Sequence, residues 1–151
     1  MSEKIKVKVS HRFKASPERV YDAWLDPEKV RLWLRVSLQN MGLSGDIGQV
    51  EVNPIVGGDF LFTDIRDGIE ARHWGTYLEL ERPNKIAFTW IVDESEASDP
   101  SRVVLTIQPE DEGCTATIVH ELDAKWADYV SQTENGWNCM LRATDTLLEN
   151  Q

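Results

Sequence analysis

The feature that most constrains the fold of this chain is a change in its hydrophobic period. Between residues 49 and 122, apolar and polar residues mostly alternate, which is typical of half-buried strands. From about residue 126 to residue 149, the apolar side chains recur at helical spacing instead. A helix with such a stripe must lay it against another layer. The pattern therefore predicts an α+β fold, in which one long C-terminal helix covers a face of an antiparallel sheet.

Turn signals divide the alternating region into separate strands. They are Gly57-Gly58, Asp67-Gly68, Pro83-Asn84, the acidic stretch DESEASDP at residues 93–100, and EDEGC at residues 110–114. Short breaks of this kind join neighbouring antiparallel strands, so a meander is expected. The strands are predicted near residues 4–14, 49–53, 58–65, 70–81, 85–92, 102–109 and 114–122.

Two short helices are predicted directly after the first strand. Ser16-Pro17-Glu18 and Asp26-Pro27-Glu28 carry the same signal, in which a capping side chain precedes a proline and a glutamate at the start of a helix. The two helices should be separated near Asp26. The segment 36–48 contains three glycines and is expected to be a loop.

The composition limits the partners and the setting. A formal net charge of -10 argues against general binding of nucleic acid or anionic lipid, because the phosphates would be repelled. No run of apolar residues approaches the ~18 of a membrane span, and MSEKIKVKVS lacks the apolar core of a signal peptide. Cys114 and Cys139 show no metal spacing and are expected to be free thiols. These observations favour one cytoplasmic domain spanning residues 1–151.

Five stretches of the sequence carry a resemblance to a known family. They are FKASPERVYDAWLDPEKVRLWL, IVGGDFLF, WGTYLELERPNKIAFTW, CTATIVHEL and NGWNCMLRATDTLLE. In this order they resemble the activator of heat-shock-protein-90 ATPase homologue-like family, which belongs to the START-related, birch-pollen-allergen-like superfamily. The resemblance implies a helix-grip fold, with a curved antiparallel sheet of about seven strands wrapped around the long C-terminal helix. Related folds bind lipids, hormones or polyketides in a cavity under that helix, and a few are cyclases or hydrolases.

The family name also suggests a stress response and a chaperone partner. Eukaryotic chaperone activators of this group carry a further N-terminal chaperone-binding domain, for which the sequence offers no counterpart. The family name alone therefore does not indicate that this chain activates a chaperone. A chaperone contact and a homodimer are left open as partners.

A set of large aromatic residues is predicted to line a ligand cavity between the sheet and the last helix. Pockets for small molecules are mostly apolar with a few polar groups, and this set matches that description. The alternative is an ordinary solid core. The predicted lining consists of Trp33, Phe60, Phe62, Trp74, Phe88, Trp90, His120, Trp137, Met140 and Leu141. Gly136 is unfavourable in a helix interior, so a neighbouring aromatic ring is expected to approach the backbone there.

No catalytic, cofactor or metal motif can be recognised in the sequence. There is no nucleophile elbow, phosphate-binding loop, dinucleotide fingerprint or paired histidine spacing. The leading interpretation is a binding domain for an apolar or aromatic molecule, without cofactor, metal or catalysis. The alternatives are a cyclase- or hydrolase-type enzyme that uses His120, Glu79 or His11 in the same cavity, and a protein-interaction module.

Overall fold

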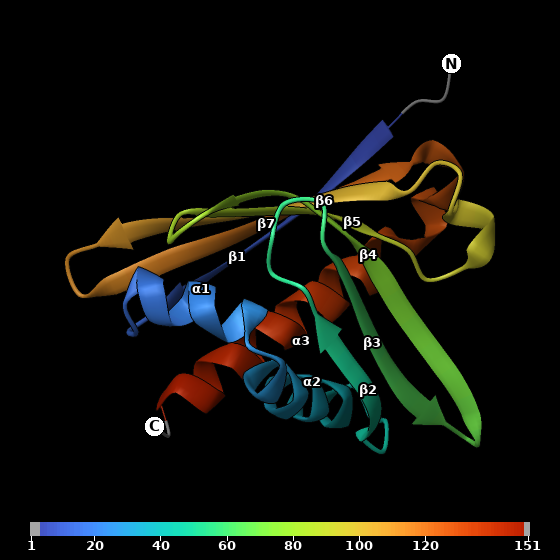
Figure 1. Ribbon diagram of the computed structural model, residues 1–151, viewed down its shortest axis with the longest axis horizontal. Helices are drawn as coiled ribbons and strands as arrows, with labels where there is room; N and C mark the ends of the chain where they lie inside the picture. The colour runs from blue at the N-terminus through green and yellow to red at the C-terminus, as the bar shows by residue number, and fades with distance from the viewer. Residues whose placement is uncertain (1–3, 150–151) are drawn as a thin grey trace.

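The computed structural model describes residues 4–149 and confirms the predicted α+β helix-grip architecture. Two helices follow the first strand, six further strands follow those helices, and a long helix ends the described chain (Figure 1). In chain order the elements are β1 Lys4–Phe13, α1 Pro17–Leu25, α2 Pro27–Asn40, β2 Asp46–Val52, β3 Asp59–Arg66, β4 Ile69–Glu81, β5 Lys85–Trp90, the short 3-10 helix η1 Glu94–Glu96, β6 Ser101–Glu110, β7 Gly113–Asp123, the 3-10 helix η2 Ala124–Tyr129 and α3 Val130–Glu149.

The seven strands form one antiparallel sheet in the order β1-β7-β6-β5-β4-β3-β2. The sheet is strongly curved, and the helices lie on one side of it, with α3 crossing beneath the strands (Figure 1). The core fills the space between that side of the sheet and the helices. Within residues 4–149, no helix is long and apolar enough to cross a membrane.

A single aspartate both ends α1 and begins α2. The backbone N–H of Asp26 donates to the carbonyl of Asp22, and its carboxylate accepts from the N–H of Glu28 at 2.9 Å. Ser16 caps α1 in a similar way by accepting from the N–H of Arg19. These contacts satisfy backbone groups that a helix end leaves unpaired. The predicted break near Asp26 is confirmed.

The predicted loop at residues 36–48 is wrong in its first part, because α2 continues to Asn40. The apolar stripe of α2 goes on through the buried Ser37 and Leu38, so those residues stay helical. After the last helical residue, Asn40, comes the capping residue Met41 and then Gly42, which adopts a φ of 85°. The N–H groups of Gly42 and Leu43 donate back to the carbonyls of Gln39 and Leu38. This is the Schellman arrangement, which uses a glycine in the left-handed region as the helix stop.

The long C-terminal helix begins where it was predicted, although its first turns have a different geometry. Residues 124–129 form the 3-10 helix η2, and Trp126 within it has φ -96° and ψ 16°. Regular α-helix starts at Val130. The 3-10 helix contacts β1 and β7, and its residues Trp126 and Tyr129 contribute to the wall of the cavity described below.

Candidate ligand-binding cavity

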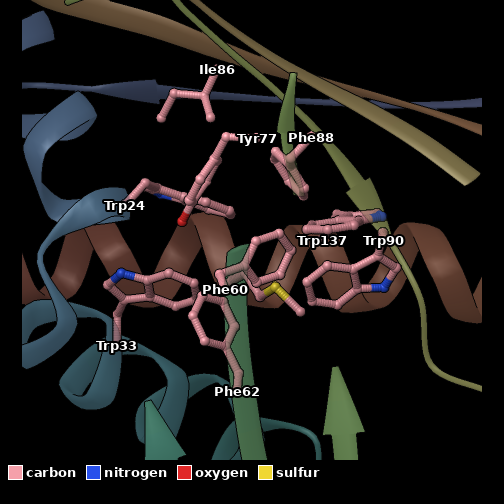
Figure 2. Close-up of a pocket in the computed structure, with 10 residues that line it drawn as sticks. Trp24, Trp33, Phe60, Phe62, Tyr77, Ile86, Phe88, Trp90 and Trp137 are labelled. Atoms are coloured by element: carbon pink, nitrogen blue, oxygen red, sulfur yellow. The ribbon is translucent and has the colours of Figure 1, made fainter. Parts of the chain in front are cut away.

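A cluster of aromatic side chains fills most of the space between the sheet and the helices. Trp24 and Trp33 stack at 4.6 Å between ring centroids, and Trp90 lies 5.0 Å from Trp137. The cluster encloses a small hollow of about 20 Å³, here called the deep hollow. Figure 2 shows its lining residues, which are Trp24, Trp33, Phe60, Phe62, Tyr77, Ile86, Phe88, Trp90, Trp137 and Met140. This volume holds about one water molecule and no more.

A second hollow, here called the large cavity, lies beside the cluster and measures about 600 Å³. Its wall is formed by the end of α2, by strands β3 to β7, by the loop that carries η1, and by η2 with the first turns of α3. Most of the wall is apolar, with residues such as Leu34, Leu38 and Leu122. The volume falls in the range of about 300–1,000 Å³ that is typical of small-molecule sites.

The two hollows share part of their walls. Phe62, Trp90, Trp137 and Met140 line both of them. The two hollows are therefore neighbours on either side of these four side chains. Met140 is the most adaptable of the four, because its side chain is unbranched and has several rotatable bonds.

Most of the residues predicted to line a cavity do line one of these hollows. Trp33, Phe60 and Phe88 line the deep hollow, and His120 lines the large cavity. Four further predicted residues line both hollows, namely Phe62, Trp90, Trp137 and Met140. Leu141 is fully buried in the core and lines neither hollow. The helix residue Trp137 thus covers tightly packed rings, and the open space lies to one side of it.

The prediction for Trp74 is wrong, and its neighbour His73 occupies the inner face instead. The β3–β4 turn has two residues, Asp67 and Gly68, both with positive φ, which places Phe62 directly opposite His73. Residues opposite one another in an antiparallel pair share a face of the sheet. His73 therefore joins the cavity wall beside Phe62, while Trp74 points to the other face, where Arg72 lies over its ring at 5.6 Å.

The expected close approach of an aromatic ring to Gly136 is also absent. A β-carbon built at this glycine would meet no atom within 4 Å apart from its own helix and neighbours. Gly136 instead forms part of the wall of the large cavity. Any larger side chain at this position would project into open space and take up volume there.

His120 stands in a chain of hydrogen bonds at the inner wall of the large cavity. The indole Nε1 of Trp137 donates to His120 Nδ1 at 3.1 Å, and His120 Nε2 lies 2.8 Å from the hydroxyl of Ser101. The Ser101 hydroxyl donates to the carbonyl of Trp90 at 2.8 Å. Because a tryptophan N–H can only donate, Nδ1 must be the acceptor and Nε2 must carry the proton. Burial also lowers the pKa of His120 to about 4, so the ring is neutral at neutral pH.

Charged residues also line the large cavity. Arg66 lines it, and its Nε donates to the carboxylate of Asp64 at 2.7 Å. Asp64 is only 2 % exposed, so this ion pair compensates a buried charge. His73 stacks on Trp90 at 5.3 Å, and burial lowers the pKa of its ring. The large cavity therefore combines aromatic side chains with polar and charged ones, which also include Asp93 and Glu96.

The other two residues considered for catalysis lie outside both hollows. Glu79 forms ion pairs with Lys85 at 2.7 Å and Arg102 at 3.1 Å. It points away from the aromatic cluster because a β-bulge between Tyr77 and Glu79 inserts a residue and reverses the alternation of β4. His11 pairs with Asp145 of α3 at 2.7 Å. The three proposed catalytic groups are therefore not brought together.

Sequence reasoning also missed several lining residues. Trp24, Tyr77 and Ile86 line the deep hollow, and Arg66 and His73 line the large cavity. Trp24 could have been found from its helical spacing to Val20 on the buried side of α1. The two-residue turn at Asp67-Gly68 was a sufficient signal for His73, because it fixes the pairing of β3 with β4.

The described residues show no other chemical centre at these hollows. Within residues 4–149, no group of three or more histidine, cysteine, aspartate or glutamate side chains is placed to hold a metal ion. Both cysteines are buried free thiols. Burial raises the pKa of the Cys114 thiol to about 11, which makes it a poor nucleophile at neutral pH.

Comparisons with known proteins agree with this architecture. The family model described as Activator of Hsp90 ATPase homolog 1-like protein matches residues 14–149. A crystal structure of a protein from Chromobacterium violaceum is 24% identical, covers 95% of this chain and 96% of its own, and has a TM-score of 0.76. The solution structure of the AHSA1-like protein from Aeromonas hydrophila is 19% identical, covers 97% and 93%, and also has a TM-score of 0.76. No curated protein matches the sequence.

Proposed function

The chain belongs to the family of Activator of Hsp90 ATPase homolog 1-like proteins, and from this premise we propose that it binds a hydrophobic or aromatic small molecule in the large cavity, without catalysis of its own. The observation that carries the proposal is the size and lining of that cavity. About 600 Å³ of mostly apolar space under a helix can enclose a molecule of several rings. The cavity is open to solvent on one side, with the exposed Val92 and Tyr129 in its wall, so a ligand has a route of entry.

The aromatic floor favours a flat ligand. Trp90 presents its ring at the cavity wall, with His73 stacked against it and Phe62 nearby. Aromatic rings prefer offset or edge-to-face neighbours, and such a floor offers both geometries to a planar molecule. The apolar residues Leu34 and Leu38 near the end of α2 also line the large cavity.

An enzyme acting in the same cavity is disfavoured by the hydrogen bonds of His120. Its contact with Ser101 resembles a nucleophile–base pair, in which the base must accept the hydroxyl proton. In a triad the third group accepts from the histidine, whereas here Trp137 donates to it. Nε2 consequently carries the proton already, and it has no lone pair with which to accept one from Ser101.

The proposal can be tested at Gly136, which forms part of the cavity wall and has no side chain to fill the space. Gly136→Phe should place a ring in the open space without displacing core atoms, whereas Gly136→Ala adds only one carbon. The readout is the fluorescence of N-phenyl-1-naphthylamine, a neutral dye that brightens in apolar surroundings. Saturable binding is expected for the wild type and for Gly136→Ala. At least a tenfold loss of affinity, about the effect of 1.4 kcal/mol, is expected for Gly136→Phe.

Two results would contradict the proposal. One is the lack of saturable binding of this dye and of a broad panel of apolar compounds to the wild type. The other is undiminished binding by a folded Gly136→Phe variant. Native mass spectrometry of protein from cell extract should in addition detect a retained small molecule, and Gly136→Phe should retain less of it than Gly136→Ala.

A further inference from the structure

Arg66 is the only cation among the described residues that line the large cavity. The other charged lining residues are Asp93 and Glu96, which belong to the loop that carries η1. Two histidines also contribute to the wall, but burial lowers the pKa of both His73 and His120, so their rings are neutral at neutral pH. The cavity wall therefore has one positive site and two negative ones.

The carboxylate of Asp64 holds the guanidinium of Arg66 in a defined orientation. The two residues lie two positions apart on β3, so both side chains are on the same face of the strand. Nε of Arg66 donates to Oδ2 of Asp64 at 2.7 Å, and Nη2 donates to Oδ1 at 3.3 Å. Asp64 is 2 % exposed, whereas the Arg66 side chain is 38% exposed. The buried carboxylate thus occupies one edge of the guanidinium and leaves the rest of the group accessible.

Three of the five N–H groups of Arg66 are left over by this pairing. A guanidinium has one N–H on Nε and two on each Nη, and Asp64 accepts one from Nε and one from Nη2. Within residues 4–149, Arg66 makes no other hydrogen bond or ion pair. The remaining N–H groups include one on each Nη, which point in parallel from the end of the side chain. A carboxylate can accept from such a pair with both of its oxygens.

The two acidic lining residues already serve the protein backbone. Oε1 of Glu96 accepts from the N–H groups of Val92 and Asp93, and Oδ1 of Asp93 accepts from the N–H of Ser95. The bond from Ser95 lowers the pKa of Asp93, which therefore stays ionised. Both carboxylates repel an anion from the η1 side of the cavity. An anionic group of a ligand is attracted only on the β3 side, at Arg66.

The ion pair lies near the aromatic part of the wall. His73 pairs with Phe62 across the hairpin and stacks on Trp90 at 5.3 Å. Besides burial, the pKa of His73 is raised by the charge of Asp64 and lowered by that of Arg66, because both charges are close to its ring. Stacking surfaces for a ring and donors for a carboxylate are thus neighbours in one cavity.

We propose that the ligand is an aromatic carboxylic acid, whose carboxylate accepts two hydrogen bonds from the free edge of Arg66 while its ring lies against Trp90 and His73. The inference rests on the proposed function and narrows its ligand from apolar molecules in general to amphipathic acids. The net charge of -10 disfavours anions elsewhere on the protein, so binding depends on this one cation. A neutral amide of the same shape binds less well, because it gains no charge pairing and its NH₂ group faces N–H donors.

The test compares acids with their primary amides, which have nearly the same shape. 2-Naphthylacetic acid and 4-(2-naphthyl)butanoic acid place the carboxylate at two distances from the ring, and each is paired with its amide. Affinities are measured at pH 7, where the acids are ionised, by displacement of N-phenyl-1-naphthylamine. At least one of the acids should bind the wild type about tenfold more tightly than its amide does, which is the ratio expected of a charge-assisted pair at a partly exposed site.

Two variants with the same change of net charge locate the source of this preference. Arg66→Gln removes the proposed cation and should reduce the ratio to about twofold or less, with the affinity for the amide nearly unchanged. Arg72→Gln is the matched control, because Arg72 lies over Trp74 on the other face of the hairpin and lines neither hollow. It should keep the full ratio. An equal loss in both variants would assign the preference to overall charge and overturn the inference.

A double variant keeps the test valid if Arg66→Gln folds poorly with Asp64 unpaired. Asp64→Asn/Arg66→Gln has the net charge of the wild type and no buried carboxylate at this position, and it should show the same loss of preference. Arg66→Lys keeps the positive charge but not the two parallel donors. It should show an intermediate ratio of about threefold.

The possible outcomes separate this inference from the proposed function. Wild-type affinities for both acids that only equal or fall below those of their amides would overturn the inference and leave the proposed function standing, since the rings still bind. A preference for the acid that survives in the double variant would also overturn it. Failure of the dye, the acids and the amides to bind the wild type would instead contradict the proposed function.

Discussion

Trp137 of the long helix donates its indole N–H to Nδ1 of His120 on strand β7, over 3.1 Å. The contact joins the helix to the sheet with a buried hydrogen bond, at the boundary between the packed aromatic rings and the large cavity. It also fixes the tautomer and the charge of the histidine. A protonated His120 would have an N–H on both ring nitrogens, and one of them would face the N–H of Trp137.

Because His120 is buried in its uncharged form, the protein should become less stable in mild acid. Burial lowers the pKa of His120 to about 4 in the folded state, whereas the unfolded chain has a histidine pKa of about 6.5. Between these values the unfolded state binds a proton that the folded state does not. The free energy of unfolding therefore falls as the pH drops below about 6.5, and the loss from this group reaches roughly 3 kcal/mol near pH 4.

The contribution of His120 can be isolated with His120→Asn, whose amide oxygen can take the place of Nδ1 and still accept from Trp137. Denaturant unfolding of both proteins is measured between pH 7 and pH 4.5. The stability difference between wild type and variant should shift by roughly 2–3 kcal/mol in favour of the variant over this range. Parallel pH profiles of the two proteins would show that His120 does not titrate in this way.

Truncation of Trp137 should cost as much as the loss of a core aromatic. Its ring contacts Trp90 and Phe88, and the hollow beneath it is only about 20 Å³. Trp137→Ala should lower the free energy of unfolding by about 3–5 kcal/mol, measured by urea unfolding. Trp137→Phe keeps most of the packing but leaves His120 Nδ1 without its donor, so a loss of roughly 1–2 kcal/mol is expected. A loss below about 1 kcal/mol for Trp137→Ala would mean that the space beneath the ring is open.

Gly136→Ala should stabilise the protein. Alanine is favoured over glycine in a helix interior by about 1 kcal/mol, and the added carbon meets nothing within 4 Å beyond its own helix and neighbours. The melting temperature and the urea midpoint should both rise. Gly75→Ala is the contrasting variant, because its β-carbon would collide with the carbonyl oxygen of Thr89. If Gly136→Ala were instead less stable than the wild type, another part of the protein would have to contact the helix at residue 136, which contradicts the open space found there.

The sequence was sufficient for the architecture because each element carries its own local signal. Ser16 and Asp26 mark the helix starts, and alternating strands separated by turns predict a meander. The failures occurred where an irregularity changes which way a side chain points. A bulge after Tyr77 moves Glu79 to the outer face, and no residue in that part of β4 announces it.

The candidate site was predictable in composition but not in shape. Aromatic residues on the inner faces of their strands could be recognised by parity, and Phe60, Phe62 and Trp90 lie where parity places them. Whether these rings leave a void depends on their rotamers and on the position of α3, neither of which has a sequence signal. Gly136 is unfavourable in a helix, which is compatible both with a close neighbouring ring and with an open cavity. The structure has open space there.

The buried ion pair of Asp64 and Arg66 beside the large cavity should show a strong energetic coupling, so that the effects of removing each partner on stability are not additive. Asp64 is 2 % exposed, and Arg66 supplies its nearest positive charge through Nε at 2.7 Å. Arg66→Gln leaves that carboxylate buried without its partner. The expected loss is about 2 kcal/mol, below the ~3–5 kcal/mol of fully buried pairs, because the Arg66 side chain is 38% exposed and water can reach the site.

The double variant Asp64→Asn/Arg66→Gln removes both charges and should recover at least half of that loss, because the uncompensated carboxylate is then absent. A double-mutant cycle with Asp64→Asn, measured by urea unfolding, gives the coupling between the two residues. The outer ion pair of Arg82 and Asp22, at 2.9 Å with both side chains about half exposed, is the matched control and should show a coupling below about 1 kcal/mol. Equal couplings for the two pairs would mean that Asp64 is solvated well enough to need no partner, and that the rim of the cavity is more open than its burial indicates.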